Sequence, residues 1–162
     1  MKMTSASFAG MFTLLTSLAL LSNPRDAMAF DPPKDPCSVL TTEQVSVALE
    51  GKVTAGKHVV ATLCEWVLAD QTSGAHPKRL TLGFLSASAW EQTKAARATM
   101  RSITRSPVQG LGEEAVFSTS PVTCTLQVKK GAAVLDIHLY GVPPEQARTK
   151  EIALARAALA KF

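Results

Sequence analysis

The chain has 162 residues, a formal net charge of +4 and a hydrophobic fraction of 46%. This length suits one domain with one core, and the hydrophobic fraction is too high for a disordered chain. The chain has no dense basic run and only one tyrosine, so it offers no aromatic and basic stacking surface for nucleic acid.

The N-terminal segment, residues 1–29, predicts a secretory signal peptide. Lys2 supplies a positive start, residues 8–22 form a short apolar run, Pro24 breaks that run, and Ala-Met-Ala at 27–29 is a small-residue cleavage site. The apolar run is shorter than the roughly 20 residues that a spanning helix needs, although an uncleaved anchor stays an alternative. We therefore expect a periplasmic or secreted mature chain that begins at Phe30 and has no stable membrane insertion.

The first predicted helix follows a proline-rich extended lead-in over residues 30–36. Thr41 is the expected N-cap, and Gln44 three residues later completes a capping box. Gly51 is placed to end the helix. About two turns are marginal in water, so this helix must pack against other elements.

Strands are predicted next at residues 53–60, 63–69 and 79–86. In the second of these strands Cys64 and Trp66 share one face and Glu65 lies on the other. Residues 70–78 form a polar loop with Gly and Pro. A second helix is predicted from Ser88, with Glu91 completing its capping box, to about Ser102.

The second half repeats this order. Residues 104–114 are expected to form a loop with one proline and two glycines, followed by a short strand and a hairpin of residues 122–130 and 132–140. The last helix begins near Pro143 and Pro144. Its apolar positions recur at steps of three and four residues: Ile152, Ala155, Leu159 and Phe162.

These elements predict an α+β fold in a single domain over residues 30–162. Most connections between the strands are short turns, which favours an antiparallel sheet with helices packed on one face. A strand–strand–strand–helix pseudo-repeat is compatible with the element order, although the two halves share no repeated residues.

Three cysteines remain in the predicted mature chain: Cys37, Cys64 and Cys124. Disulfides persist outside the cytoplasm, and three cysteines allow three single pairings. We favour Cys37 with Cys64, because this bridge would hold the lead-in and the short helix on the sheet. Pairing of Cys64 with Cys124 across adjacent strands stays open, and Cys124 otherwise reads as an inert buried residue.

The sequence predicts no metal site, no cofactor and no catalytic residue. It contains no C-x-x-C and no H-x-x-x-H, and His58, His76 and His138 are far apart. A Cys124–His138 dyad is disfavoured because strand alternation places these two side chains on opposite faces.

Two pairs of acidic residues are candidates for a catalytic carboxylate pair. Glu113 with Glu114, or Asp136 with Glu65, could serve a two-carboxylate hydrolase, although their spacing does not require it. The segment GLGEEAVF at 110–117 lacks the pattern of a phosphate loop, and the chain has no G-x-S-x-G motif.

Several blocks of the chain together carry a resemblance to a known family. They are DPCSVLTTEQVSVALEG at 35–51, CEW at 64–66, GLGEEAVF at 110–117, LQVKKGAAVLDIHLYG at 126–141 and the Ala-rich C-terminal helix. Together they resemble a family of small secreted bacterial proteins and lipoproteins of unknown function, common in actinobacteria, with a D-P-C-x-L-L-T-x-x-E-V-like block and a later C-x-W. The resemblance implies a Cys37–Cys64 pair and no catalytic residues. This chain departs from it in lacking a lipobox cysteine and in having Cys124.

The main functional hypothesis is an exported, non-enzymatic binding module for an unknown envelope or extracellular protein or small ligand. It would use a curved sheet face or a groove flanked by helices. The first alternative is an inhibitor or accessory subunit of an envelope enzyme, and the second is the hydrolase described above. For contact with a partner, the loops at 70–78 and 104–114 offer these residues: Asp70, His76, Lys78, Arg105, Gln109 and Glu113.

Overall fold

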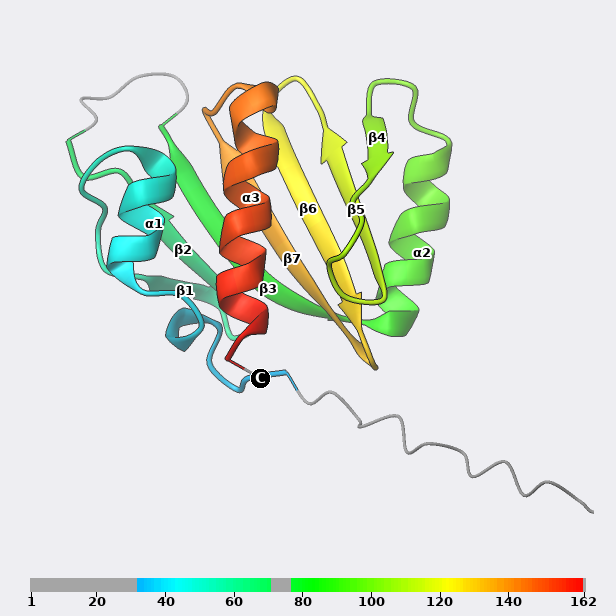
Figure 1. Ribbon diagram of the computed structural model, residues 1–162, viewed down its shortest axis with the longest axis horizontal. Coiled ribbons are helices and arrows are strands. Elements are labelled where there is room, and N and C mark those ends of the chain that lie inside the picture. Colours follow the sequence, from blue (N-terminus) through cyan, green and yellow to red (C-terminus); the bar gives the residue numbers. More distant parts are fainter. Residues whose placement is uncertain (1–31, 71–76, 162) are drawn as a thin grey trace, which may run out of the picture.

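A computed structural model describes residues 32–70 and 77–161. The predicted signal peptide, Phe30, His76 and Phe162 lie outside the described residues. The strands form one antiparallel sheet of seven strands in the order β1-β2-β3-β7-β6-β5-β4 (Figure 1). They are β1 (Lys57–Val60), β2 (Leu63–Val67), β3 (Arg79–Ser86), β4 (Thr104–Pro107), β5 (Glu114–Thr119), β6 (Thr123–Lys130) and β7 (Ala133–Tyr140).

The helices are the short 3₁₀ helix η1 (Pro36–Ser38), α1 (Thr42–Leu49), α2 (Ala87–Ala98) and α3 (Pro144–Leu159). The predicted α+β class and antiparallel sheet are confirmed. The capping box of the first helix is also confirmed, because the Thr41 hydroxyl accepts a hydrogen bond from the Gln44 backbone N–H at 3.2 Å and the Gln44 side chain accepts from the Thr41 backbone N–H at 2.8 Å.

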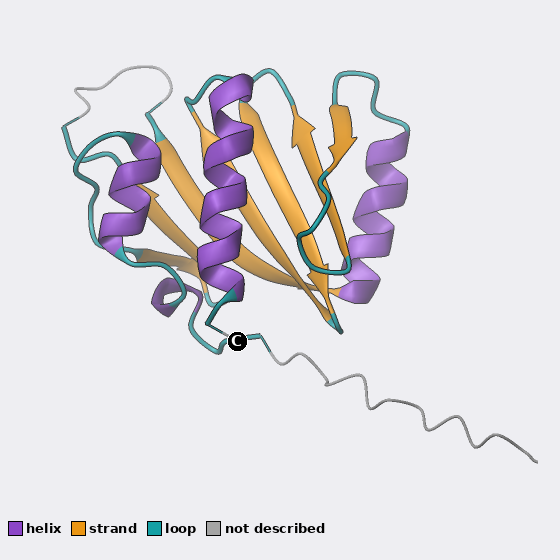
Figure 2. Cartoon of the chain, viewed as in Figure 1, coloured by secondary structure: helices purple, strands orange, loops and turns teal. Residues whose placement is uncertain are grey.

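The core lies between the sheet and the pair α1 and α3 (Figure 2). Register places Leu82 of β3 beside Ile137 of β7, and Ile137 beside Leu126 of β6, with all three side chains fully buried. Alternation then points the intervening side chains of these strands to the opposite face of the sheet. One face is therefore the core and the other is free to carry polar residues.

Helix α2 lies against this other face, whereas the sequence pattern predicted all helices on one face. Its Arg97 donates to the Gln127 side chain at 2.6 Å, and Gln127 alternates with core-facing Leu126 along β6. The local reason is that β3 runs into α2 without connecting residues, since Ser86 ends the strand and its hydroxyl caps the helix by accepting from Ala89 N–H at 3.1 Å.

Several predicted boundaries need correction. The N-cap of α2 is Ser86 and not Ser88, and the helix ends at Ala98. Glu50 and not Gly51 adopts the left-handed conformation that ends α1, with φ +60°. The segment expected as a loop at 104–114 begins with the edge strand β4, which pairs with β5.

The predicted pseudo-repeat is present in the order of the elements along the chain but not in their arrangement in space. The elements β1-β2-β3-α2 and β5-β6-β7-α3 both follow the predicted pattern. Because α2 and α3 pack on opposite faces of the sheet, the two halves are not copies of one arrangement (Figure 2).

Candidate functional site

The face of the sheet opposite α1 and α3, which we call the open face, carries a group of polar side chains that contact one another. Over β1, β2, β3 and β7 it is hollowed, with a volume of about 480 Å³. The polar residues that line this hollow are Thr62, Glu65, Arg79, Thr81, Asp136, His138 and Tyr140. Exposed Val59 and Val60 of the edge strand β1 lie at its rim.

Strand alternation puts these residues together. Thr81 of β3 pairs with Glu65 of β2 on one side and with His138 of β7 on the other. Each of the three strands alternates one core residue with one residue of the open face. This follows from a period of two and from the register that the buried leucines impose.

A hydrogen-bonded chain fixes the imidazole of His138. Its Nε2 lies 3.0 Å from Asp136 Oδ2, and its Nδ1 lies 3.1 Å from the Thr125 hydroxyl on the neighbouring strand. When the proton is on Nε2, the ring donates to the Asp136 carboxylate and accepts from the Thr125 hydroxyl at Nδ1. The side chains of His138 and Asp136 are 19% and 13% exposed, so this group is mostly enclosed by the sheet.

A second group of contacting side chains begins at the His138 ring. The rings of His138 and Tyr140 stack with centroids 6.2 Å apart, and the Arg79 guanidinium lies 4.2 Å from the Tyr140 centroid. Arg79 also lies 3.8 Å from the Glu65 carboxylate. Cation–π contact and ion pairing therefore hold Arg79 over the open face.

Thr125, His138 and Asp136 have the order of hydroxyl, base and orienting carboxylate that activates a nucleophile. However, Thr125 is only 5% exposed, so a substrate has little access to its hydroxyl. The arrangement is best suited to holding His138 rigid. Strand alternation alone puts Asp136 and His138 on one face, whereas Thr125 lies on another strand, and only the cross-strand register places it beside His138.

The two predicted carboxylate pairs differ in the structure. Glu65 and Asp136 line the same hollow, but each already has a partner, Arg79 and His138 respectively. Glu113 and Glu114 point to different neighbours. Glu113 accepts from Gly131 N–H at 2.7 Å, and Glu114 pairs with Lys94 at 2.7 Å, which lowers the pKa of Glu114.

The residues predicted to contact a partner are dispersed. Asp70 and Gln109 are exposed, and Lys78 lies 3.8 Å from Glu50. Arg105 is on β4 and points toward α2, and His76 lies outside the described residues. The 104–114 segment does not protrude as a free loop.

That segment is bound at both ends to the sheet. It begins as β4, and beyond the turn Glu113 N–H donates to the Lys129 carbonyl at 2.9 Å. Gly112 allows this approach, because its φ is +63° and a Cβ there would lie 2.4 Å from the same carbonyl oxygen.

The favoured disulfide is present between Cys37 and Cys64, with a Cα–Cα distance of 5.1 Å. Cys64 and Trp66 share the buried face of β2, and a Cβ on Gly56 would lie 2.9 Å from Cys64 Sγ and 2.7 Å from the Trp66 indole. The bridge therefore joins η1 to the sheet at a closely packed point.

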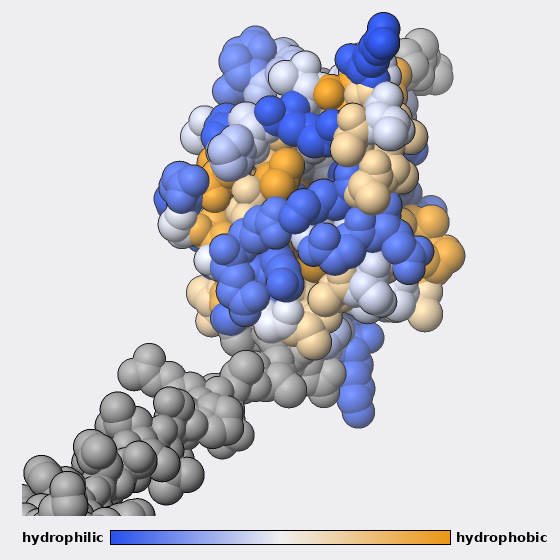
Figure 3. Space-filling model, turned by 90° about the vertical axis from the view of Figure 1, so that its right-hand side faces the viewer, coloured by the Kyte–Doolittle hydropathy of each residue, from blue (hydrophilic) through white to orange (hydrophobic). Residues whose placement is uncertain are grey.

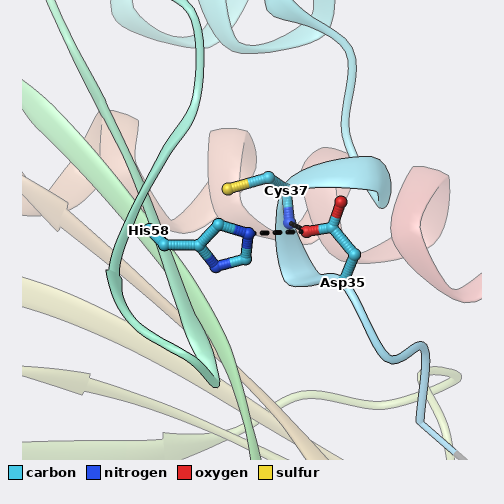
Figure 4. A group of neighbouring side chains, drawn as sticks. All are labelled: Asp35, Cys37 and His58. Atoms are coloured by element: carbon cyan, nitrogen blue, oxygen red, sulfur yellow. Dashed lines mark hydrogen bonds and ion pairs between the residues drawn. The ribbon is translucent and has the colours of Figure 1, made fainter.

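Asp35, Cys37 and His58 cluster beside this bridge (Figure 4). Asp35 Oδ1 accepts from Cys37 N–H at 2.8 Å and lies 3.2 Å from His58 Nε2. The Cys37 sulfur is oxidised in the disulfide, so it is not the thiolate that binds metals. The cluster is explained as a cap on η1 that also reaches β1.

Two titratable groups are buried on the core side: Glu151, which was not identified from the sequence, and Cys124, which was predicted as an inert buried residue. Glu151 of α3 is fully buried and accepts from Leu139 N–H at 3.1 Å, and burial raises its pKa to about 9. Cys124 is a buried free cysteine, and burial, with the nearby Glu151, raises its pKa to about 11. This thiol stays protonated and unreactive at neutral pH.

Among the described residues, no helix has both the length and the apolar character that crossing a membrane requires. Comparison with known proteins adds no relative: no protein-family model, no curated protein and no solved structure matches the chain.

Proposed function

We propose that the protein is exported and acts, without catalysing a reaction, as a binding module that holds a segment of an envelope or extracellular protein on its open face. The observation that carries this proposal is the rigid polar group in the hollow, bordered by exposed valines. The covered face of the sheet already has its core, so the fold does not need this group for burial.

The chemistry of the hollow suits a polypeptide segment. It offers charges of both signs at Glu65 and Arg79, an aromatic ring at Tyr140, and apolar contact at Val59 and Val60. Mixed polar and apolar groups on a rigid support are typical of protein interfaces, where aromatic and Arg residues contribute most of the binding energy. The ring of Tyr140 and the guanidinium of Arg79, held together, form such an anchor.

Two features support export. The Cys37–Cys64 disulfide is of a kind that persists in oxidising compartments. The predicted signal peptide would deliver the chain there. The D-P-C and C-x-W blocks that resemble the secreted bacterial family contain the two halves of this bridge.

The test is site-specific photo-crosslinking in the cells that produce the protein. A photoreactive residue replaces Val60, which is 57% exposed at the rim of the hollow, or Val47, which is 79% exposed on α1. We expect Val60 to capture a discrete extracytoplasmic protein and Val47, the matched control on the other side of the sheet, to capture none. Arg79→Glu should then abolish the capture at Val60.

Equal capture at both positions, or capture at Val47 alone, would contradict the open face as the binding surface. Mass spectrometry of the protein isolated from the same cells tests export separately. The expected product begins at Phe30 and contains one disulfide, whereas an uncleaved chain that stays in the cytoplasm would contradict export.

A further inference from the structure

A second cavity lies between α2 and the strands β4, β5 and β6, with a volume of about 240 Å³. Three side chains on its wall have a buried hydrogen-bond donor without a partner: Trp90 Nε1, Arg105 Nη2 and Gln127 Nε2. Trp90 and Gln127 are 1% and 2% exposed. Buried donors are normally satisfied by protein groups or by ordered water, so three of them in one cavity mark a place that accepts hydrogen-bond acceptors from outside the chain.

The orientation of Gln127 is fixed by its neighbour. Its Oε1 accepts from Arg97 Nη1 at 2.6 Å, and a flipped amide would place two donors against each other. The amide N–H₂ group therefore stays turned away from Arg97. Trp90 Nε1 is near enough to Glu114 to contribute to lowering the pKa of that carboxyl, but makes no hydrogen bond of normal geometry with it.

The cavity is positively charged. Lys94, Arg97 and Arg105 line it, and no acidic residue does. Lys94 is paired with Glu114, but among the described residues neither arginine has a carboxylate within 4.0 Å. The remaining walls are largely apolar and include the Trp90 ring, Pro107 and Val116. In the space-filling view of this side, hydrophilic side chains lie beside hydrophobic ones (Figure 3).

We propose that this cavity, which we call the donor pocket, binds a small organic carboxylate. An ionised carboxylate has acceptors only, in about four lone-pair directions, which matches the three unpartnered donors, one of them on Arg105, and the second guanidinium group of Arg97. The apolar part of the ligand then lies against Trp90, Pro107 and Val116. Inorganic phosphate has no apolar part and would leave these walls without contact.

The volume of the donor pocket agrees with a ligand larger than one water molecule. It is several times the roughly 30 Å³ that one water occupies in the liquid. The donor pocket is distinct from the hollow over β1, β2, β3 and β7, so this inference does not depend on the proposed protein-binding function.

The test is an NMR titration of the whole chain with sodium benzoate at constant ionic strength. We expect saturable shifts of the Trp90 indole N–H and the Gln127 side-chain amide, with the Trp66 indole unchanged as an internal reference. Benzyl alcohol, the neutral analogue, should bind at least about tenfold more weakly, because hydrogen bonds to an ionised acceptor are roughly twice as strong as those between neutral groups.

Two variants locate the site. Arg105→Gln should weaken benzoate binding about tenfold or more, while Arg101→Gln, an exposed residue that does not line the cavity, removes the same charge and should have no effect. Gln127→Glu keeps the side-chain shape and should abolish binding, since the new carboxylate would pair with Arg97 and repel the ligand.

The proposal is overturned if benzyl alcohol binds as tightly as benzoate, or if inorganic phosphate binds more tightly than benzoate. It is equally overturned if Arg105→Gln folds, as circular dichroism would show, and retains full affinity. Absence of any saturable shift at Trp90 and Gln127 would also refute it.

Discussion

Glu151 is an acidic side chain placed inside the core, on the face of α3 that packs against β7. It is fully buried, Oε1 accepts from Leu139 N–H, and Oε2 has no partner among the described residues. Burial raises the pKa of Glu151 to about 9, with a further contribution from the charge of Asp136. At neutral pH the folded chain therefore keeps this carboxyl protonated.

A raised carboxyl pKa makes the folded state less stable as pH rises. Between pH 4.5, the ordinary value in the unfolded chain, and about pH 9, the folded chain holds a proton that the unfolded chain has lost. The free energy of unfolding should therefore decrease across this window. Glu151→Gln keeps the acceptor for Leu139 N–H and removes the ionisation, so it should stabilise the protein at pH 7 by on the order of 2 kcal/mol.

Urea unfolding at pH 4, 7 and 8.5 measures this effect. The variant and the wild type should be similar at pH 4 and should diverge toward pH 8.5. Glu145→Gln, which removes an exposed carboxylate from the first turn of the same helix, is the matched control and should leave the pH dependence as it is. A constant difference between Glu151→Gln and wild type at every pH would contradict the buried, protonated carboxyl.

At this scale the sequence shows which side chains can titrate but not which are buried. The apolar pattern predicted a stripe through Ile152, Ala155 and Leu159, and the structure centres the buried face of α3 on Glu151, Leu154, Ala155 and Ala158. A glutamate beside that stripe is normally placed in water. Its burial depends on the contact with Leu139. Because Leu139 lies on β7, this contact cannot be predicted from the sequence pattern of the helix.

The elements of the N-terminal region depend on one covalent link. The helix α1 is only eight residues long, and η1 only three, so neither is stable alone. The disulfide closes a loop of 27 residues, and the loop-entropy relation assigns about 3 to 4 kcal/mol to a closure of this length. We expect the double variant Cys37→Ala/Cys64→Ala to lose about this amount in the free energy of unfolding.

Chemical unfolding followed by circular dichroism provides the measurement. Cys124→Ala, which leaves the bridge intact and removes a buried sulfur, is the control and should cost clearly less than the double variant. A double variant that is no less stable than Cys124→Ala would show that packing around Gly56 and Trp66, and not the bridge, holds the N-terminal region.

Elements with strong periodicity were predictable from the sequence, and those defined by long-range contact were not. The strand at 79–86 and both strands of the 122–140 hairpin were placed correctly within a residue, because alternating apolar residues span their whole length. The strand β4 was missed, since its four residues contain no such alternation and pair only at the edge. The side on which α2 packs was also not predictable, since it depends on cross-sheet contacts such as Arg97 with Gln127.

On the scale of the whole molecule, the order β1-β2-β3-β7-β6-β5-β4 joins two runs of neighbouring strands through a single long-range pair. Strands β3 and β7 pair over their full length, from Arg79 with Tyr140 to Ser86 with Ala133, although the paired residues lie 47 to 61 positions apart in the chain. The candidate hollow lies across this junction. Neither half of the chain can form it alone, so the proposed binding surface requires strands from both halves.

Hydrogen exchange should reveal this organisation directly. We expect the slowest backbone amides in β3, β7 and β6, which lie inside the sheet and whose side chains are buried under α3 or beside it. The fastest strand amides should be in the edges β1, where all four residues are exposed, and β4. Amides at the centre exchange only when the sheet opens globally, whereas edge strands open locally at a lower free-energy cost. Native-state exchange measured by NMR distinguishes the two classes.

Slow exchange confined to the β5–β6–β7 half, with β3 as fast as β1, would mean that the β3–β7 junction opens independently and that the hollow is not permanently assembled.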